Sequence, residues 1–127
     1  MFNSNKICSL LNIKFPIIQG GMAWSTDSKL ACAVSDAGGL GIIGCGGRDP
    51  DWVIDEIDKS KKITSRQIGL NVAMNDSNAI DIVEIAITVA FAKQYFFVCF
   101  RTSRALFSNS SIVHSARKNK HYHFNLY

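Results

Sequence analysis

Two glycine-rich stretches hold the residues of this 127-residue chain whose types and spacing could do chemistry. The first, Gly20-Gly21-Met22-Ala23, follows a short apolar run, and the second is Gly44-Cys45-Gly46-Gly47. Glycine has no Cβ and lets the backbone approach a flat or anionic ligand closely. Asn71 follows a third apolar run, and its amide can both donate and accept hydrogen bonds. The structural alternatives are a tight turn for the glycines, core packing for Met22 and a strand-end cap for Asn71.

Each of these stretches follows a predicted strand and precedes a predicted helix. The strands are expected over residues 16–19, 40–43 and 68–72, and the helices over about 27–37, 50–62 and 78–87, after a short leading helix over 7–11. Thr26 or Asp27 is expected to cap the first long helix, and Asp49 before Pro50 the second. Alternating strands and helices predict a parallel sheet whose binding loops follow the strands. Two architectures stay open: a doubly wound sheet, or part of a (β/α)8 barrel.

The apolar residues also predict which faces are buried. Ile17 and Ile18 are β-branched, and we expect them in a strand that is buried on both faces. The helix over 27–37 is expected to bury an apolar stripe at helical spacing. Its members are Leu30, Ala31, Ala33, Val34 and Ala37.

A dinucleotide-binding pattern in the sequence is misleading. Residues 39–44 spell G-x-G-x-x-G. That pattern binds a pyrophosphate only where it follows a strand and opens a helix. Here a predicted helix precedes it and a strand lies within it, so we exclude a Rossmann site.

Taken together, residues 16–24, 37–44 and 69–71 closely resemble the start of the nitronate monooxygenase family. That family includes the FMN-dependent type II enoyl-acyl-carrier-protein reductases of fatty acid biosynthesis, and the resemblance covers about residues 6–88. It implies an oxidoreductase built as a TIM barrel, with FMN at the carboxyl ends of the strands. It also implies six residues in contact with the flavin: Gly21, Met22, Ala23, Gly44, Gly46 and Asn71.

The resemblance further implies a small-molecule substrate, either a nitronate or an enoyl thioester on acyl carrier protein. NAD(P)H would be the reductant in the reductase case. We assign no catalytic residue, because His114, His121 and His123 lack the small residues that flank the family's catalytic histidine. We also assign no metal site, since the last two histidines have no acidic or cysteine partner nearby. A homo-oligomer is left open.

The composition of the chain changes near residue 89. All acidic residues lie at or before Glu84, whereas all three histidines and most aromatic residues lie after it. We therefore divide the chain into an N-terminal part of an FMN-binding TIM-barrel domain, 1–88, and a divergent basic, aromatic-rich tail, 89–127. Within that tail, 95–100 is strand-like. We interpret the chain as a truncated or frame-disrupted oxidoreductase, weakly active or inactive, that binds FMN poorly because its phosphate loops would follow later strands.

An alternative of another class is a small basic module that binds nucleic acid or an anionic surface through the tail. Under the leading interpretation we expect no nucleic-acid partner. No export signal and no apolar run of transmembrane length is visible, so no membrane partner is expected. The scattered cysteines, Cys8, Cys32, Cys45 and Cys99, are expected to be reduced thiols in the cytoplasm.

Overall fold

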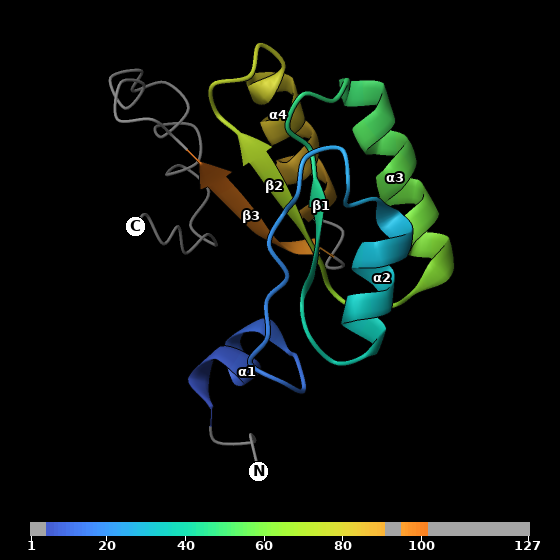
Figure 1. Ribbon diagram of the computed structural model, residues 1–127, viewed down its shortest axis with the longest axis vertical. Coiled ribbons are helices and arrows are strands. Elements are labelled where there is room, and N and C mark those ends of the chain that lie inside the picture. Colours follow the sequence, from blue (N-terminus) through green and yellow to red (C-terminus); the bar gives the residue numbers. More distant parts are fainter. Residues whose placement is uncertain (1–4, 91–94, 102–127) are drawn as a thin grey trace.

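The computed structural model describes residues 5–90 and 95–101 of the chain, and it confirms the predicted alternation of strands and helices (Figure 1). The elements are α1 (Lys6–Leu11), α2 (Ser28–Asp36), β1 (Gly41–Gly44), α3 (Pro50–Ile63), β2 (Ile68–Ala73), α4 (Ala79–Ala90) and β3 (Tyr95–Arg101). The strand-like segment 95–100 is therefore β3, and it pairs in parallel with β2. The third predicted strand runs past Asn71 to Ala73.

The strands are parallel and lie in chain order, β1-β2-β3. The first predicted strand, 16–19, is present only as a single parallel bridge between Ile18 and Leu40. The Gln19 amide donates to the Leu40 carbonyl at 2.9 Å, and the Leu40 amide donates to the Ile17 carbonyl at the same distance. Ile17 is 61% exposed and Ile18 44%, so the prediction that both are buried is wrong. This segment is the outermost in the sheet and has one neighbouring strand among the described residues.

The long helices form a single layer beside the sheet (Figure 1). α2 packs on β1 and on α3, α3 packs on α4, and α4 packs on β2 and β3. In a doubly wound sheet the strand order reverses and the helices cover both faces. In a (β/α)8 barrel the strands lie in chain order and each helix contacts the next, as they do here. The structure thus decides between the two architectures in favour of a partial barrel.

The two faces of the strands have different neighbours. Alternate residues of β2, Ile68, Leu70 and Val72, are buried in the main core with the helices. Successive side chains of a strand point to opposite faces, so Asn71 and Ala73 face away from the helix layer. On that second face, Leu11 of α1 packs with Leu40 and Ile42.

α2 buries a face that differs from the predicted stripe. Its buried residues are Ser28, Ala31, Cys32 and Ser35, whereas Leu30, Ala33 and Ala37 are exposed. The cause is the close approach of α2 to β1: a Cβ on Gly41 would overlap the backbone of Ala31. Only small side chains fit at such a distance. Ser35 also stabilises the contact, since its hydroxyl accepts from the Gly41 amide at 2.9 Å and donates to the Gln67 carbonyl at 2.8 Å.

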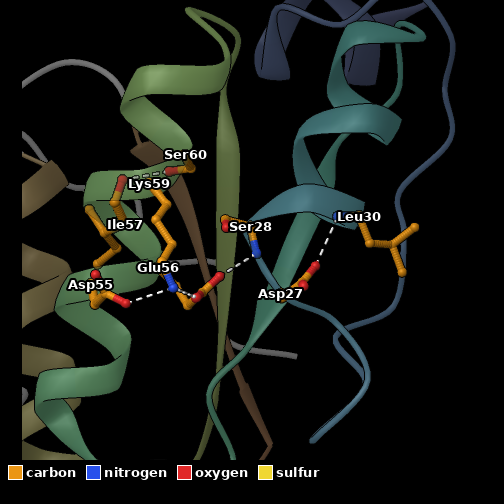
Figure 2. A network of polar contacts seen from close by, with 8 residues as sticks. All are labelled: Asp27, Ser28, Leu30, Asp55, Glu56, Ile57, Lys59 and Ser60. Atoms are coloured by element: carbon orange, nitrogen blue, oxygen red, sulfur yellow. Dashed lines mark hydrogen bonds and ion pairs between the residues drawn. The ribbon is translucent and has the colours of Figure 1, made fainter.

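Two carboxylates, one at the N-cap of α2 and one on α3, accept hydrogen bonds from backbone amides in the first turn of α2 (Figure 2). The predicted cap Asp27 accepts from the Leu30 amide at 3.0 Å, and Glu56 of α3 accepts from the Ser28 amide at 2.7 Å. The Lys59 ammonium lies 2.7 Å from both Asp55 and Glu56. Burial alone would raise the pKa of Glu56, but hydrogen bonds from Lys59 and Ser28 outweigh it and lower the pKa. The other predicted cap, Asp49, occupies the N-cap position of α3 without a side-chain hydrogen bond.

Candidate functional site

The candidate site lies where the loops that follow three neighbouring strands meet, at the carboxyl end of the sheet. Gly44, the last residue of β1, is directly opposite Asn71 of β2 in the strand register. Gly21 in the first loop is packed so tightly on Asn71 that a Cβ on the glycine would overlap the asparagine side chain. Asn71 therefore lies at the junction of all three segments.

The remaining predicted residues adjoin this junction. A Cβ on Gly44 would lie 2.5 Å from the Met22 carbonyl oxygen. A Cβ on Gly46 would lie 3.4 Å from the Ala73 Cβ and 3.6 Å from the Ala23 Cβ. The structure thus brings all six predicted residues to one end of the sheet. It also shows why two of them are glycines: at Gly21 and Gly44 the loops contact each other with no room for a side chain.

A cavity of about 400 Å³ opens beside the junction. Ala23 and Gly46, two of the six predicted residues, line it. The other lining residues are Trp24, Gly47, Ala73, Asn75 and Asp76. Trp24 and Asp76 were missed by the sequence reasoning. For Trp24 the available signal was its place between the glycine pair at 20–21 and the cap of α2 at Asp27, where it belongs to a loop rather than to a helix face.

Several polar groups near the cavity have no hydrogen-bond partner within the described part of the chain. They include the Asn71 side-chain amide and the backbone N–H groups of Gly21, Ala23 and Gly46. The side-chain oxygen of Gln19 is buried and likewise unpartnered there, while its nitrogen donates to Thr26 Oγ1 at 3.2 Å. Donors and acceptors lying together are what the edge of a flavin ring requires. The residues present therefore fit the ring portion of FMN.

The charge in the cavity is negative. Its one charged lining residue, Asp76, accepts hydrogen bonds from the backbone amides of Gly47 and, at 3.2 Å, of Asn78. Both hydrogen bonds lower the pKa of the Asp76 carboxyl, and the one from Gly47 has the larger effect. A carboxylate that stays ionised disfavours a phosphate beside it. The cavity thus suits a neutral group better than an anionic one.

Cys45, in the second loop, does not have the character of a nucleophile. Its thiol is buried and donates to the Ile43 carbonyl over 3.7 Å, and burial raises its pKa to about 12. Burial likewise raises the pKa of Cys32 to about 11. Both thiols, like that of Cys8, are free and buried. No group of three or more metal-ligating side chains occurs in ranges 5–90 and 95–101.

An arginine in the second loop contacts the cavity wall. The guanidinium carbon of Arg48 lies 4.2 Å from the ring centroid of Trp24 and 4.2 Å from that of Trp52. Trp24 has a φ of 67°, in the left-handed region. A bulky residue there costs on the order of 1–3 kcal/mol and persists only where its surroundings hold it.

Comparison with known proteins agrees with this geometry. A model of the nitronate monooxygenase family matches residues 4–115. The chain belongs to the nitronate monooxygenase family. The resemblance inferred from the glycine-rich motifs is thereby confirmed.

Individual relatives show the extent of the match. A probable nitronate monooxygenase of Staphylococcus aureus (strain JH9) is 40% identical over 95 residues, which make up 75% of this chain and 27% of the relative. The structure of FabK from Thermotoga maritima superposes with a TM-score of 0.74 at 34% identity, covering 89% of this chain and 34% of FabK. A nitroalkane oxidase of Streptomyces ansochromogenes has a TM-score of 0.51 at 31% identity, over 67% of this chain and 24% of that protein.

The chain therefore spans between 24% and 34% of the length of these relatives. This agrees with the predicted fold, the N-terminal βα units of a (β/α)8 barrel. The predicted boundary at residue 88 stays a prediction, as does the origin of the segment after it. The basic residues and histidines of 102–127 lie outside the described residues. No helix in the described part is long and apolar enough to cross a membrane.

Proposed function

We propose that this chain is the flavin-ring-contacting, N-terminal part of an FMN-dependent oxidoreductase of the nitronate monooxygenase or enoyl-acyl-carrier-protein reductase type. One observation carries the proposal: Gly21, Gly44 and Asn71, from three separate loops and strands, meet at the carboxyl end of the sheet beside a cavity of about 400 Å³. Parallel barrels bind their ligands at that end.

The residues of this chain would bind and orient the ring. The unpartnered N–H groups of Gly21 and Ala23 and the amide of Asn71 would hydrogen-bond its edge, while Met22 and Gly46 would contact it through backbone atoms. Bound FMN would supply the electron transfer, from NAD(P)H or from a nitronate. Cys45 stays protonated and Asp76 is held by two backbone amides, so neither is suited to move a proton in the reaction.

The substrate would be a nitronate or an enoyl thioester on acyl carrier protein, and we expect a cytoplasmic protein. The names of the Staphylococcus and Streptomyces relatives refer to nitro compounds and support the first class. The glycine-rich motifs resemble the reductase branch more closely, and FabK has the higher TM-score, 0.74 against 0.51, which supports the second class, so we propose both. Phosphate binding and proton transfer would belong to strands beyond those of this match. We therefore expect the chain alone to be weakly active or inactive, and a homo-oligomer is left open.

The test is a titration of the purified full chain with FMN and with riboflavin, followed by flavin fluorescence. Because Asp76 is the one charged residue among the described residues that line the cavity, we expect weak binding with similar affinity for both ligands. Asn71→Ala should weaken binding by about tenfold, the effect of roughly 1.4 kcal/mol in lost hydrogen bonds. Ser65→Ala, an exposed change between α3 and β2, is the control and should change nothing.

Two results would contradict the proposal. One is the absence of any flavin binding by a folded chain, and the other is equal binding by the Asn71→Ala and unsubstituted chains. A stoichiometric yellow complex that survives purification would instead contradict the expectation of weak binding.

A further inference from the structure

A stack of one cation and two aromatic rings supports the cavity wall, and only its outer member, Trp24, lines the cavity. Arg48 lies over both Trp24 and Trp52, at 4.2 Å from each ring centroid, well within cation–π range. Trp52, near the start of α3, is half-buried and packs against the main core. Trp24 lines the cavity and is 68% exposed. The stack thus connects a ring anchored in the core to a ring at the cavity.

Trp24 has a left-handed backbone conformation, which a bulky side chain disfavours. Its φ is 67°, and its indole lies over Gly47, where an added Cβ would be 3.1 Å from the ring. Such backbone outliers persist where tertiary contacts over-determine them. The contacts that hold this indole come from the second loop: Gly47 at the ring edge and Arg48 over its face.

The second loop is itself fixed to the third. The Gly47 amide donates to Asp76, and the Asn78 side chain donates to the Arg48 carbonyl at 3.4 Å. The Nε atom of Arg48 is buried and has no hydrogen-bond partner in the described ranges. The two rings, rather than a carboxylate, therefore determine where the guanidinium lies.

We propose that Arg48 is a positioning residue: its guanidinium, between a core-anchored Trp52 and the cavity-lining Trp24, fixes Trp24 as a rigid wall and so sets the shape of the cavity for a planar ligand. The backbone turn around Trp24 is closed by hydrogen bonds from the Ser25 and Thr26 amides to the Met22 carbonyl, so loss of the guanidinium frees the indole of Trp24, and with it the wall, rather than the turn. The effect on a ligand rests on the proposed function, whereas the effect on Trp24 does not.

The two tryptophans are the only ones in the chain, which permits a direct test on the full-length protein. In a Trp52→Phe background the fluorescence reports on Trp24 alone. Time-resolved anisotropy and near-ultraviolet circular dichroism are then compared for Arg48→Ala, for Arg48→Lys and for the control Arg66→Ala, an exposed arginine outside the stack. We expect Arg48→Ala to raise the amplitude of fast depolarisation and to reduce the dichroism of Trp24. Arg48→Lys, which keeps the charge but not the planar group, should be intermediate, and Arg66→Ala unchanged.

Riboflavin titration of the same variants separates the two proposals. Weakening of about tenfold in Arg48→Ala, with a loosened Trp24, supports both. A loosened Trp24 with unchanged flavin affinity supports the positioning role and counts against the flavin site. If Arg48→Ala leaves the anisotropy and the dichroism of Trp24 unchanged, the positioning role is overturned, whatever the riboflavin affinity of the variant. If far-ultraviolet dichroism shows that Arg48→Ala is unfolded, Arg48→Lys decides by the same measurements.

Discussion

Asn71 is the residue at which the candidate site is assembled. It faces away from the helices, lies opposite Gly44, and has its carbonyl bonded by the Cys45 amide at 2.9 Å. Its side chain occupies the space that a Cβ on Gly21 would need. The first loop can therefore pack on β2 at this point only because residue 21 has no side chain.

Gly21→Ala should lower the free energy of unfolding by about 1–3 kcal/mol, since the added methyl group must displace Asn71 or the loop. Gly20→Ala is the matched control, because nothing lies within 4 Å of the position of its Cβ. Urea denaturation followed by circular dichroism measures both. Equal stability of the two variants would show that the first loop does not pack on Asn71.

At the scale of the elements, the carboxylate of Glu56 connects α3 to the start of α2. It is buried, accepts from the Ser28 amide and is paired with Lys59 (Figure 2). The first amides of a helix have no partner within the helix, so this contact satisfies a group that burial would otherwise leave unpaired. It also orients two helices of the layer that supports the loops.

Glu56→Gln should reduce the free energy of unfolding by about 1.5–3 kcal/mol at neutral pH, as expected for the loss of charged hydrogen bonds. The folded state lowers the pKa of Glu56 below its ordinary 4.5, so its stabilisation is present above that pH and is lost as the pH falls below it. The difference between the two proteins should therefore shrink on acidification below pH 4.5.

The control for this measurement is Asp58→Asn on the same helix. Asp58 pairs with Lys61 at 2.9 Å in solvent, and we expect no measurable change from its loss. Denaturation curves that stay equally far apart from neutral to acidic pH would contradict the assigned role of Glu56.

At the scale of the molecule, the described sheet has unpaired edges. The segment 16–19 has one neighbouring strand among the described residues, and Ile17 and Ile18 are exposed there. Exposed apolar edges of a sheet pair readily with other chains. In a closed barrel such an edge does not exist.

Ile17→Lys should therefore reduce self-association of the purified chain, because a charge on the edge opposes strand pairing. Light scattering as a function of concentration measures the effect. Ile80→Lys is the control: Ile80 is 52% exposed but lies on α4, away from this edge. An equal reduction by both substitutions would indicate general apolar adhesion rather than edge pairing.

Local signals in the sequence predicted the order of the elements and the limits of the helices. Asp27 caps α2 as predicted, Pro50 begins α3, and Gly38 follows α2 with a φ of 104°. Each depends on the conformational preference of one residue or on a hydrogen bond within one turn, and such preferences can be read without knowledge of the fold. The glycine-rich motifs could identify the family because each motif is one contiguous stretch of sequence, which can be recognised without knowledge of the fold.

Contacts between distant segments were decided only by the tertiary structure. Burial of Ser35 rather than Leu30, exposure of Ile17, the packing of Gly21 on Asn71 and the position of Arg48 over Trp24 all depend on how closely two elements approach. Side-chain type and spacing along the chain do not specify that distance. Motif order thus predicted parallel βα units with their binding loops, and the family resemblance implied a barrel, whereas the strand order that decides for a partial barrel and the shape and charge of the cavity depend on long-range packing.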